Sequence, residues 1–216
     1  MKKIQKFVLF GLILAGCGGT NYLRPSQGAF AHIEHVAIVV NGEPDFKVLD
    51  SRATDLGPGV LFGAIGAIAN SAYTNSKDAT QEKELKPQTS QISYRETFVD
   101  QIKKFLQESK RFSKIDFYEQ SNLKDQSVDA VLELSICEWG IRLINRQSSD
   151  LVPFITVEIR LTDSKGKVLW KERDVEVGHS GHSVAAYRTE ENLLKDSLHA
   201  VLKDTAYRIV STLIYS

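Results

Sequence analysis

Two histidines, His179 and His182, are the residues whose type and spacing come nearest to a metal site in this sequence. Histidine is the commonest metal ligand, and side chains three residues apart can lie together. Zinc takes three or four protein ligands, however, and no further ligand stands at suitable spacing beside this pair. The intervening Ser180-Gly181 favours a loop. We therefore expect no cofactor, and metal binding only by these two candidates.

Nucleophilic chemistry has one candidate, Cys137, which alternates with Trp139 in a stretch typical of a β-strand. A cysteine in such a position is usually a small core hydrophobe. A catalytic thiol would need a histidine partner, which the sequence does not place. Neither a Gly-x-Ser-x-Gly turn nor a His-Glu-x-x-His helix is present. We expect no catalytic residue and predict that the protein is not an enzyme.

Glycines cluster between residues 57 and 69, where Gly57 and Gly59 precede the apolar stretch VLFGAIGAIA. The spacing does not match the dinucleotide fingerprint, and no Gly-Lys-Ser/Thr follows. Gly59, Gly63 and Gly66 instead form a small-residue stripe if the segment is helical, which permits close packing. Packing inside the domain and contact with a membrane or with a second copy are the two interpretations.

The overall charge argues against nucleic-acid binding. The 216 residues contain 27 Lys and Arg against 27 Asp and Glu, and only two cysteines. Nucleic-acid binders carry a basic excess, and disulfide scaffolds need more cysteines. A basic stretch from Lys103 to Lys114 is interpreted as a solvated helix face, with contact to anionic envelope polymers or headgroups as the alternative.

The first sixteen residues have the pattern of a secretory signal. Three lysines precede the short apolar run 7–14, and small residues follow it. This run is too short to span a bilayer as a permanent helix, which needs roughly 20 residues. Cleavage after residue 16 would remove the three lysines, so that acidic side chains outnumber basic ones by three in the rest of the chain.

Leu14-Ala15-Gly16-Cys17 resembles the lipobox of bacterial lipoproteins. The resemblance implies that Cys17 becomes the mature amino terminus and carries a diacylglyceryl thioether and an amide-linked acyl chain, commonly palmitate. Two or three chains hold a protein on a membrane essentially permanently. Gly18, rather than aspartate, implies sorting to the outer membrane, facing the periplasm, if the cell is Gram-negative.

The elements that follow are predicted from periodicity and turn residues. We expect a tether over 17–31 and a single domain over 32–216, in which residues 70–91 form an exposed loop. Ser93 and Glu96 match a capping box, which predicts a helix to about Lys110. A phase change of the apolar positions predicts a β-bulge near Ile136–Glu138. The remaining predicted elements are strands at 33–40, 115–118, 130–143, 155–162 and 168–177, a turn at 163–166, and a helix at 190–213.

This order predicts an α+β fold: a two-layer mixed sheet, β-α-β followed by an antiparallel meander, covered on one face by two helices. Its order of elements, with the stretch LTDSKGKVLW at 161–170 among them, loosely resembles small envelope α/β lipoprotein domains. Such domains are those of the curli secretion lipoprotein, the activators of peptidoglycan synthases and the Tol propeller protein. The resemblance implies docking to partners or self-association rather than catalysis.

Three functions follow as hypotheses. The first is a lipid-anchored, non-catalytic adaptor or accessory subunit that binds another component of the cell envelope. The second is an oligomeric secretion or export subunit that uses the Gly-rich segment 57–69. The third is a metal-binding or enzymatic envelope protein that uses His179 and His182.

Overall fold

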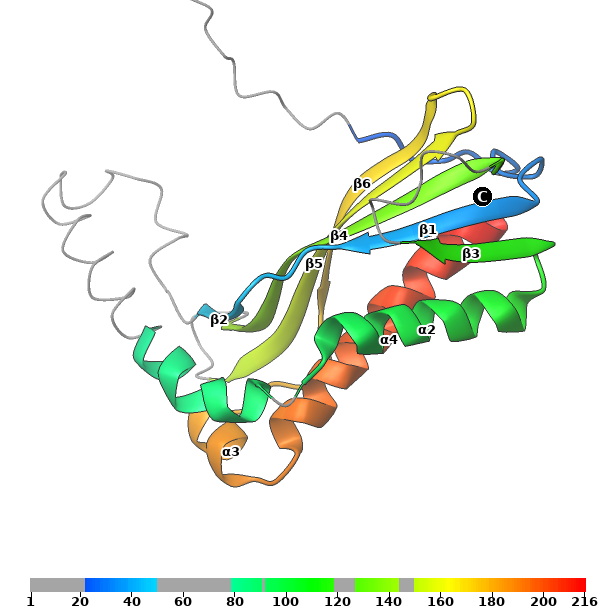
Figure 1. The fold of residues 1–216 in the computed structure, drawn as a ribbon. Coiled ribbons are helices and arrows are strands. Elements are labelled where there is room, and N and C mark those ends of the chain that lie inside the picture. Colours follow the sequence, from blue (N-terminus) through cyan, green and yellow to red (C-terminus); the bar gives the residue numbers. More distant parts are fainter. Residues whose placement is uncertain (1–21, 50–78, 91, 119–126, 144–149) are drawn as a thin grey trace, which may run out of the picture.

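The computed structural model describes residues 22–49, 79–90, 92–118, 127–143 and 150–216 (Figure 1). Their elements, in chain order, are β1 (His35–Asn41), β2 (Phe46–Leu49), α2 (Tyr94–Ser109), β3 (Lys114–Tyr118), β4 (Ala130–Leu143), β5 (Leu151–Asp163), β6 (Val168–Val177), α3 (Val184–Thr189) and α4 (Leu193–Tyr215). Residues 79–89 are also helical. None of the described helices is long and apolar enough to cross a membrane.

The described strands form one mixed sheet in the order β3-β1-β4-β5-β6, with β2 beside the second half of β4. β1 runs parallel to both β3 and β4, whereas β4, β5 and β6 form an antiparallel meander. The predicted α+β class, the parallel pairing of the first and second predicted strands and the meander are confirmed. β4 lies against β1 rather than at the far side of β3, so β1 is an interior strand.

Helices α2 and α4 cover the same face of the sheet (Figure 1), as predicted. Every apolar residue predicted to line one face of the last helix is buried, from Leu194 to Leu213. They pack over the inward-facing residues of the meander, such as Leu134 and Ile159. Each fully buried side chain of this size contributes about 1.5–3 kcal/mol relative to its exposed state, so this interface stabilises the two layers.

The predicted β-bulge is confirmed. The register of β4 against β5 shifts between Ile136 and Glu138. Before the shift Leu134 and Ile136 are buried, and after it Trp139 and Ile141 are buried. One extra residue is what allows a strand with two opposite alternation phases to keep its apolar side chains on the same core.

The predicted turn between β5 and β6 is also confirmed. Asp163 Oδ1 accepts hydrogen bonds from the backbone N–H groups of Lys165 and Lys167, each at 2.9 Å. Gly166 has φ +81°, which glycine adopts without a Cβ penalty. The short side chain of Asp163 therefore accepts the hydrogen bonds of two backbone N–H groups at the tip of this hairpin.

The exposed loop predicted over 70–91 is wrong for the part that the structure describes, because residues 79–89 are helical. Leu85 in this segment is fully buried. A single buried leucine leaves no periodicity to detect, while the surrounding Glu, Lys and Gln residues favour a helix. Residues 70–78 lie outside the described residues.

The capping box predicted at Ser93 is not formed, although the helix is present. Ser93 is the N-cap of α2, but its side chain makes no capping hydrogen bond, and only its backbone oxygen accepts from Thr97 N–H at 2.9 Å. Ser183 caps the short helix α3 instead, accepting from Ala186 N–H at 3.1 Å. Helix α3 follows the loop that contains His179 and His182, and it was not predicted.

Part of the predicted tether packs on the domain. The backbone of Leu23 pairs with that of Lys171 on edge strand β6. Phe30 is buried, with its ring centroid 6.3 Å from that of Trp170. The Arg111 guanidinium donates to the Phe30 carbonyl at 2.8 Å. The packed part of the chain thus begins before residue 32, where the domain was expected to begin. The reason is that the apolar side chain of Phe30 is buried beside Trp170 of β6.

Candidate functional site: an aromatic cleft beside the β-bulge

Three aromatic side chains from separate segments meet where β4 continues past its bulge. The ring centroid of Trp139 lies 4.3 Å from that of Tyr94, and the two rings are stacked. Phe46 of β2 contacts the same indole edge-on at 5.3 Å. Such offset and edge-to-face pairs contribute about 0.5–1.5 kcal/mol beyond their buried area. The bulge is what turns Trp139 to the face on which α2 begins.

The backbone around this cluster depends on two glycines. A Cβ at Gly140 (φ +153°) would overlap the carbonyl oxygen of Lys47, which lies on the paired strand β2. A Cβ at Gly42 (φ +91°) would overlap the carbonyl oxygen of Ile136. These close approaches bring β2 and the connection that precedes it tightly against β4. The Trp139 indole N–H then donates to the Pro44 carbonyl in that connection at 2.9 Å.

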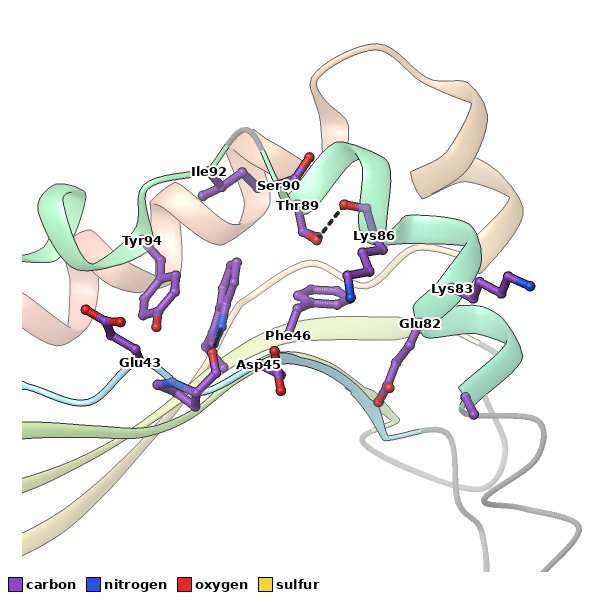
Figure 2. A pocket seen from close by; sticks show the side chains of 13 residues that line it. Glu43, Asp45, Phe46, Glu82, Lys83, Lys86, Thr89, Ser90, Ile92 and Tyr94 are labelled. Atoms are coloured by element: carbon purple, nitrogen blue, oxygen red, sulfur yellow. Dashed lines mark hydrogen bonds between the residues drawn. The ribbon is translucent and has the colours of Figure 1, made fainter.

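A cleft of about 600 Å³ opens between this cluster and the helical segment 79–89 (Figure 2). Its lining is amphipathic, with the aromatic side chains beside acidic and basic ones. The charged residues of the lining are Glu43, Asp45, Glu82, Lys83 and Lys86. Figure 2 shows Lys86 of the helical segment and Phe46 of β2 on opposite sides of the cleft that both line. The volume of the cleft lies within the range of about 300–1,000 Å³ that is usual for ligand pockets.

Glu82 joins the two sides of the cleft. Its Oε1 accepts a hydrogen bond from the backbone N–H of Val48 at 3.1 Å, although the two residues are 34 positions apart. Val48 lies in β2, and Glu82 lies in the helical segment that follows residue 78. The two stretches of chain that flank residues 50–78 are thus held together at the rim of the cleft.

The cleft keeps the Tyr94 phenol in its neutral form. Burial, and then the negative charge of Glu43, raise the pKa of the Tyr94 phenol, so it stays protonated at neutral pH. The lining contains neither histidine nor cysteine. Tyr, Trp and Phe, which form the aromatic cluster of the cleft, are enriched at protein interfaces.

The two predicted candidate histidines do not form a metal site in the described residues. The His179 side chain is 86% exposed and lies 3.7 Å from the Asp204 carboxylate. His182 pairs through its backbone with Leu151, and its ring contacts Tyr187. Across the described ranges, no three side chains of His, Cys, Asp or Glu gather as a ligand set.

Cys137 is not the core residue that the alternation suggested. It sits at the bulge, half-buried, and its thiol donates to the Ser135 carbonyl at 3.4 Å. Burial, and then the charge of Glu158, raise the pKa of the thiol. A protonated thiol is a poor nucleophile, in keeping with a structural role. Cys17 and the glycines Gly59, Gly63 and Gly66 lie outside the described residues.

Sequence reasoning missed two polar clusters. Asp116 of β3 accepts a hydrogen bond from His35 at 2.7 Å and forms an ion pair with Lys114 at 2.9 Å. These two interactions, of which that with Lys114 is the larger, lower the pKa of Asp116 to about 2. On β6, Arg208 of α4 pairs with Asp174 and with Glu176. The pairing of β1 with β3 brings His35 to Asp116, and the packing of α4 on β6 brings Arg208 to Asp174 and Glu176, so tertiary structure was needed to find both clusters.

The cleft residues of segment 79–89 were missed because that segment was predicted to be a loop. Glu82 and Lys86 carried no signal of their own. The run from Thr80 to Leu85, rich in residues with high helix propensity, was the one available indication.

The chain is similar to several solved structures of bacterial proteins. The PelC dodecamer from Paraburkholderia phytofirmans is 15% identical, with a TM-score of 0.44 over 88% of this chain and 94% of that chain. Protein XCC0632 from Xanthomonas campestris, assigned to DUF330, is 12% identical, with a TM-score of 0.45 over 89% and 91%. A minor lipoprotein from Acinetobacter baumannii is 15% identical, with a TM-score of 0.39 over 56% and 86%.

At these identities and TM-scores, the likeness assigns no activity and no residue role to this chain. No protein-family model matches the sequence, and neither does any curated protein. The similar structures reported above are described as a dodecamer, a DUF330 protein and a lipoprotein.

Proposed function

We propose that the protein is a non-catalytic, lipid-anchored adaptor of the bacterial cell envelope that binds a protein partner in the aromatic cleft. The observation that carries the proposal is the cleft itself, in which Trp139, Tyr94 and Phe46 stand beside Lys86 and Glu82. Trp and Tyr dominate the energetics of protein interfaces, and charged side chains around them give specificity. The anchor is the acylated Cys17, with the domain in the periplasm.

The position of the cleft suits an anchored protein. The packed chain starts at Leu23, which pairs with Lys171 of β6. Across the sheet, Lys171 pairs with Arg160 of β5, and Arg160 pairs with Glu133 of β4. Trp139 lies six residues further along β4, which corresponds to about 20 Å along the sheet. Figure 1 shows β2 and the start of the described chain toward opposite ends of the domain. An anchor at the amino terminus would leave the cleft accessible to a partner.

The anchor is tested by Cys17→Ser, with Cys137→Ser as the matched control. If the acylated Cys17 anchors the protein, the Cys17→Ser variant should move from the membrane fraction to the soluble fraction, whereas the Cys137→Ser variant stays with the membranes. Radiolabelled palmitate should label the wild type and Cys137→Ser alone. A Cys17→Ser chain that fractionates with membranes and retains the label would contradict the anchor.

The cleft is tested by in-cell photo-crosslinking of the full chain. A photoreactive amino acid at exposed Lys86, on the rim of the cleft, should trap a defined envelope protein that mass spectrometry can identify. The same group at Lys195, exposed on α4, is the control and should not trap it. Equal crosslinks from both positions, or none from Lys86, would overturn the cleft as the docking site.

A second candidate is self-association through the glycine-rich segment 57–69. The spacing of Gly59, Gly63 and Gly66 motivates it, and the Val48–Glu82 hydrogen bond holds the described flanks of this part of the chain together. Native mass spectrometry of the full chain in detergent tests this proposal. A multiple of the protomer mass that is lost in a Gly59→Leu, Gly63→Leu variant supports it, and a single protomer mass at all concentrations contradicts it.

A further inference from the structure

A second cleft lies between helix α2 and edge strand β3, lined by none of the residues of the aromatic cleft. Its volume is about 510 Å³, and its floor is apolar, formed by Leu106, Phe112, Ile115 and Phe117. A neighbouring hollow of about 500 Å³ shares Lys103 and Phe117 with it. The lining of that neighbouring hollow includes Glu96 and Asp100, so we give the name α2–β3 groove to the cleft of about 510 Å³ alone.

The charge of the cleft is one-sided. Lys103, Lys110 and Lys114 line it, and none of its nine lining residues is acidic. This local excess stands out because the chain as a whole has equal numbers of acidic and basic residues. Lys114 is already paired with Asp116 at 2.9 Å. Lys103 and Lys110 are therefore the cations that a ligand in the cleft would meet.

The helix dipole does not explain Lys103. Cations near a helix C-terminus are favourable, but the effect is confined to the last turn. The last turn of α2 contains no basic residue, and Lys103 lies in the middle of the helix. Its Nζ lies 5.0 Å from the centre of the Phe117 ring, so the cation is held directly over the apolar floor. This contact joins the charged and the apolar halves of the groove at one point.

We propose that the α2–β3 groove binds a small amphiphilic anion, a molecule with one phosphate head and one acyl chain. The chain lies on the floor of Phe112, Ile115 and Phe117, and the head group meets Lys103 and Lys110. Each buried methylene contributes about 0.8 kcal/mol, and the lysines supply charge complementarity. Neither a neutral amphiphile nor a free anion satisfies both halves of the groove. This inference depends neither on the lipid anchor nor on the aromatic cleft.

The test is isothermal titration calorimetry with the full chain carrying Cys17→Ser, in buffer without detergent. The two amphiphilic probes are kept below their critical micelle concentrations. The three probes are dodecyl phosphate, dodecyl maltoside and inorganic phosphate. We expect dodecyl phosphate to bind at one site. Dodecyl maltoside, which has the same chain without charge, and inorganic phosphate, which has no chain, should each bind at least about tenfold more weakly.

Substitutions in the groove test whether the ligand binds there. Lys103→Gln combined with Lys110→Gln should weaken dodecyl phosphate at least about tenfold. Lys104→Gln, an exposed lysine of the same helix outside the lining, should leave the affinity unchanged. Phe117→Ala should also weaken it, while far-ultraviolet circular dichroism stays the same. Absence of dodecyl phosphate binding, equal binding of any two probes, or an unchanged affinity in the double-lysine variant would overturn the proposal.

Discussion

The indole N–H of Trp139 donates to the carbonyl oxygen of Pro44 at 2.9 Å, across 95 positions of sequence. The donor lies directly after the β-bulge of β4, and the acceptor lies in the connection between β1 and β2. This bond fixes the wall of the aromatic cleft, because it holds the indole in the plane that Tyr94 stacks on.

Replacing Trp139 should therefore separate the contribution of the hydrogen bond from that of the packing. Trp139→Phe keeps an aromatic ring but leaves the Pro44 carbonyl without its donor, so we expect a loss of about 1–3 kcal/mol in the free energy of unfolding. Trp139→Ala also leaves a cavity and should lose about 3–5 kcal/mol. Urea unfolding followed by far-ultraviolet circular dichroism measures both. Equal losses in the two variants would contradict the role of the ring.

Gly140→Ala should weaken the pairing of β2 with β4. The added Cβ would overlap the Lys47 carbonyl oxygen, and the position has φ +153°. We expect a loss of about 3 kcal/mol, at the upper end for a point substitution. Gly166→Ala is the control, because its φ of +81° is also positive but no atom lies within 4 Å of the added Cβ, so it should lose only about 1 kcal/mol. Thermal unfolding distinguishes the two variants.

The carboxyl group of Asp174 should make stability depend on pH. Burial raises its pKa to about 6, although the Arg208 cation beside it acts in the opposite direction, and Glu176 and Glu172 add to the increase. The folded state then holds this proton more tightly than the unfolded state, whose pKa is about 3.9. The contribution to the free energy of unfolding therefore falls as the pH rises from about 4 to about 6, and is level above that range.

Asp174→Asn removes this titration. The free energy of unfolding of the variant minus that of the wild type should increase between pH 4 and pH 7, measured by urea unfolding at both values. Asp196→Asn, at an exposed position of α4, serves as the control and should show no such trend. A difference between Asp174→Asn and wild type that is constant across this range would exclude a raised pKa for Asp174.

Tyr187→Phe should loosen the attachment of the short helix α3. The Tyr187 hydroxyl is buried and donates to the Leu151 carbonyl at 3.0 Å, and burial raises the pKa of the phenol to about 12, so it remains a donor. The Leu151 carbonyl keeps its second donor, His182 N–H. We expect a loss of about 1 kcal/mol in the free energy of unfolding. Tyr215→Phe, at a position 78% exposed, should change it by less than about 0.5 kcal/mol.

Elements whose signals are local could be predicted from the amino-acid sequence. Alternation predicted β4, β5 and β6, the change of phase predicted the bulge at Ile136–Glu138, and Asp163 with Gly166 predicted the hairpin turn. The apolar face of α4 could be predicted for the same reason. Each signal comes from side-chain periodicity or from a few adjacent turn residues, so no distant contact is needed to detect it.

The other features depend on tertiary contacts. The insertion of β4 beside β1, the pairing of β2 with β4, and the helix at 79–89 with its single buried Leu85 all depend on partners far along the chain. The aromatic cleft joins Phe46, Tyr94 and Trp139 from three such segments, and the α2–β3 groove joins Lys103 to Phe117. The physical reason is that packing between elements, rather than local propensity, sets which side chains meet.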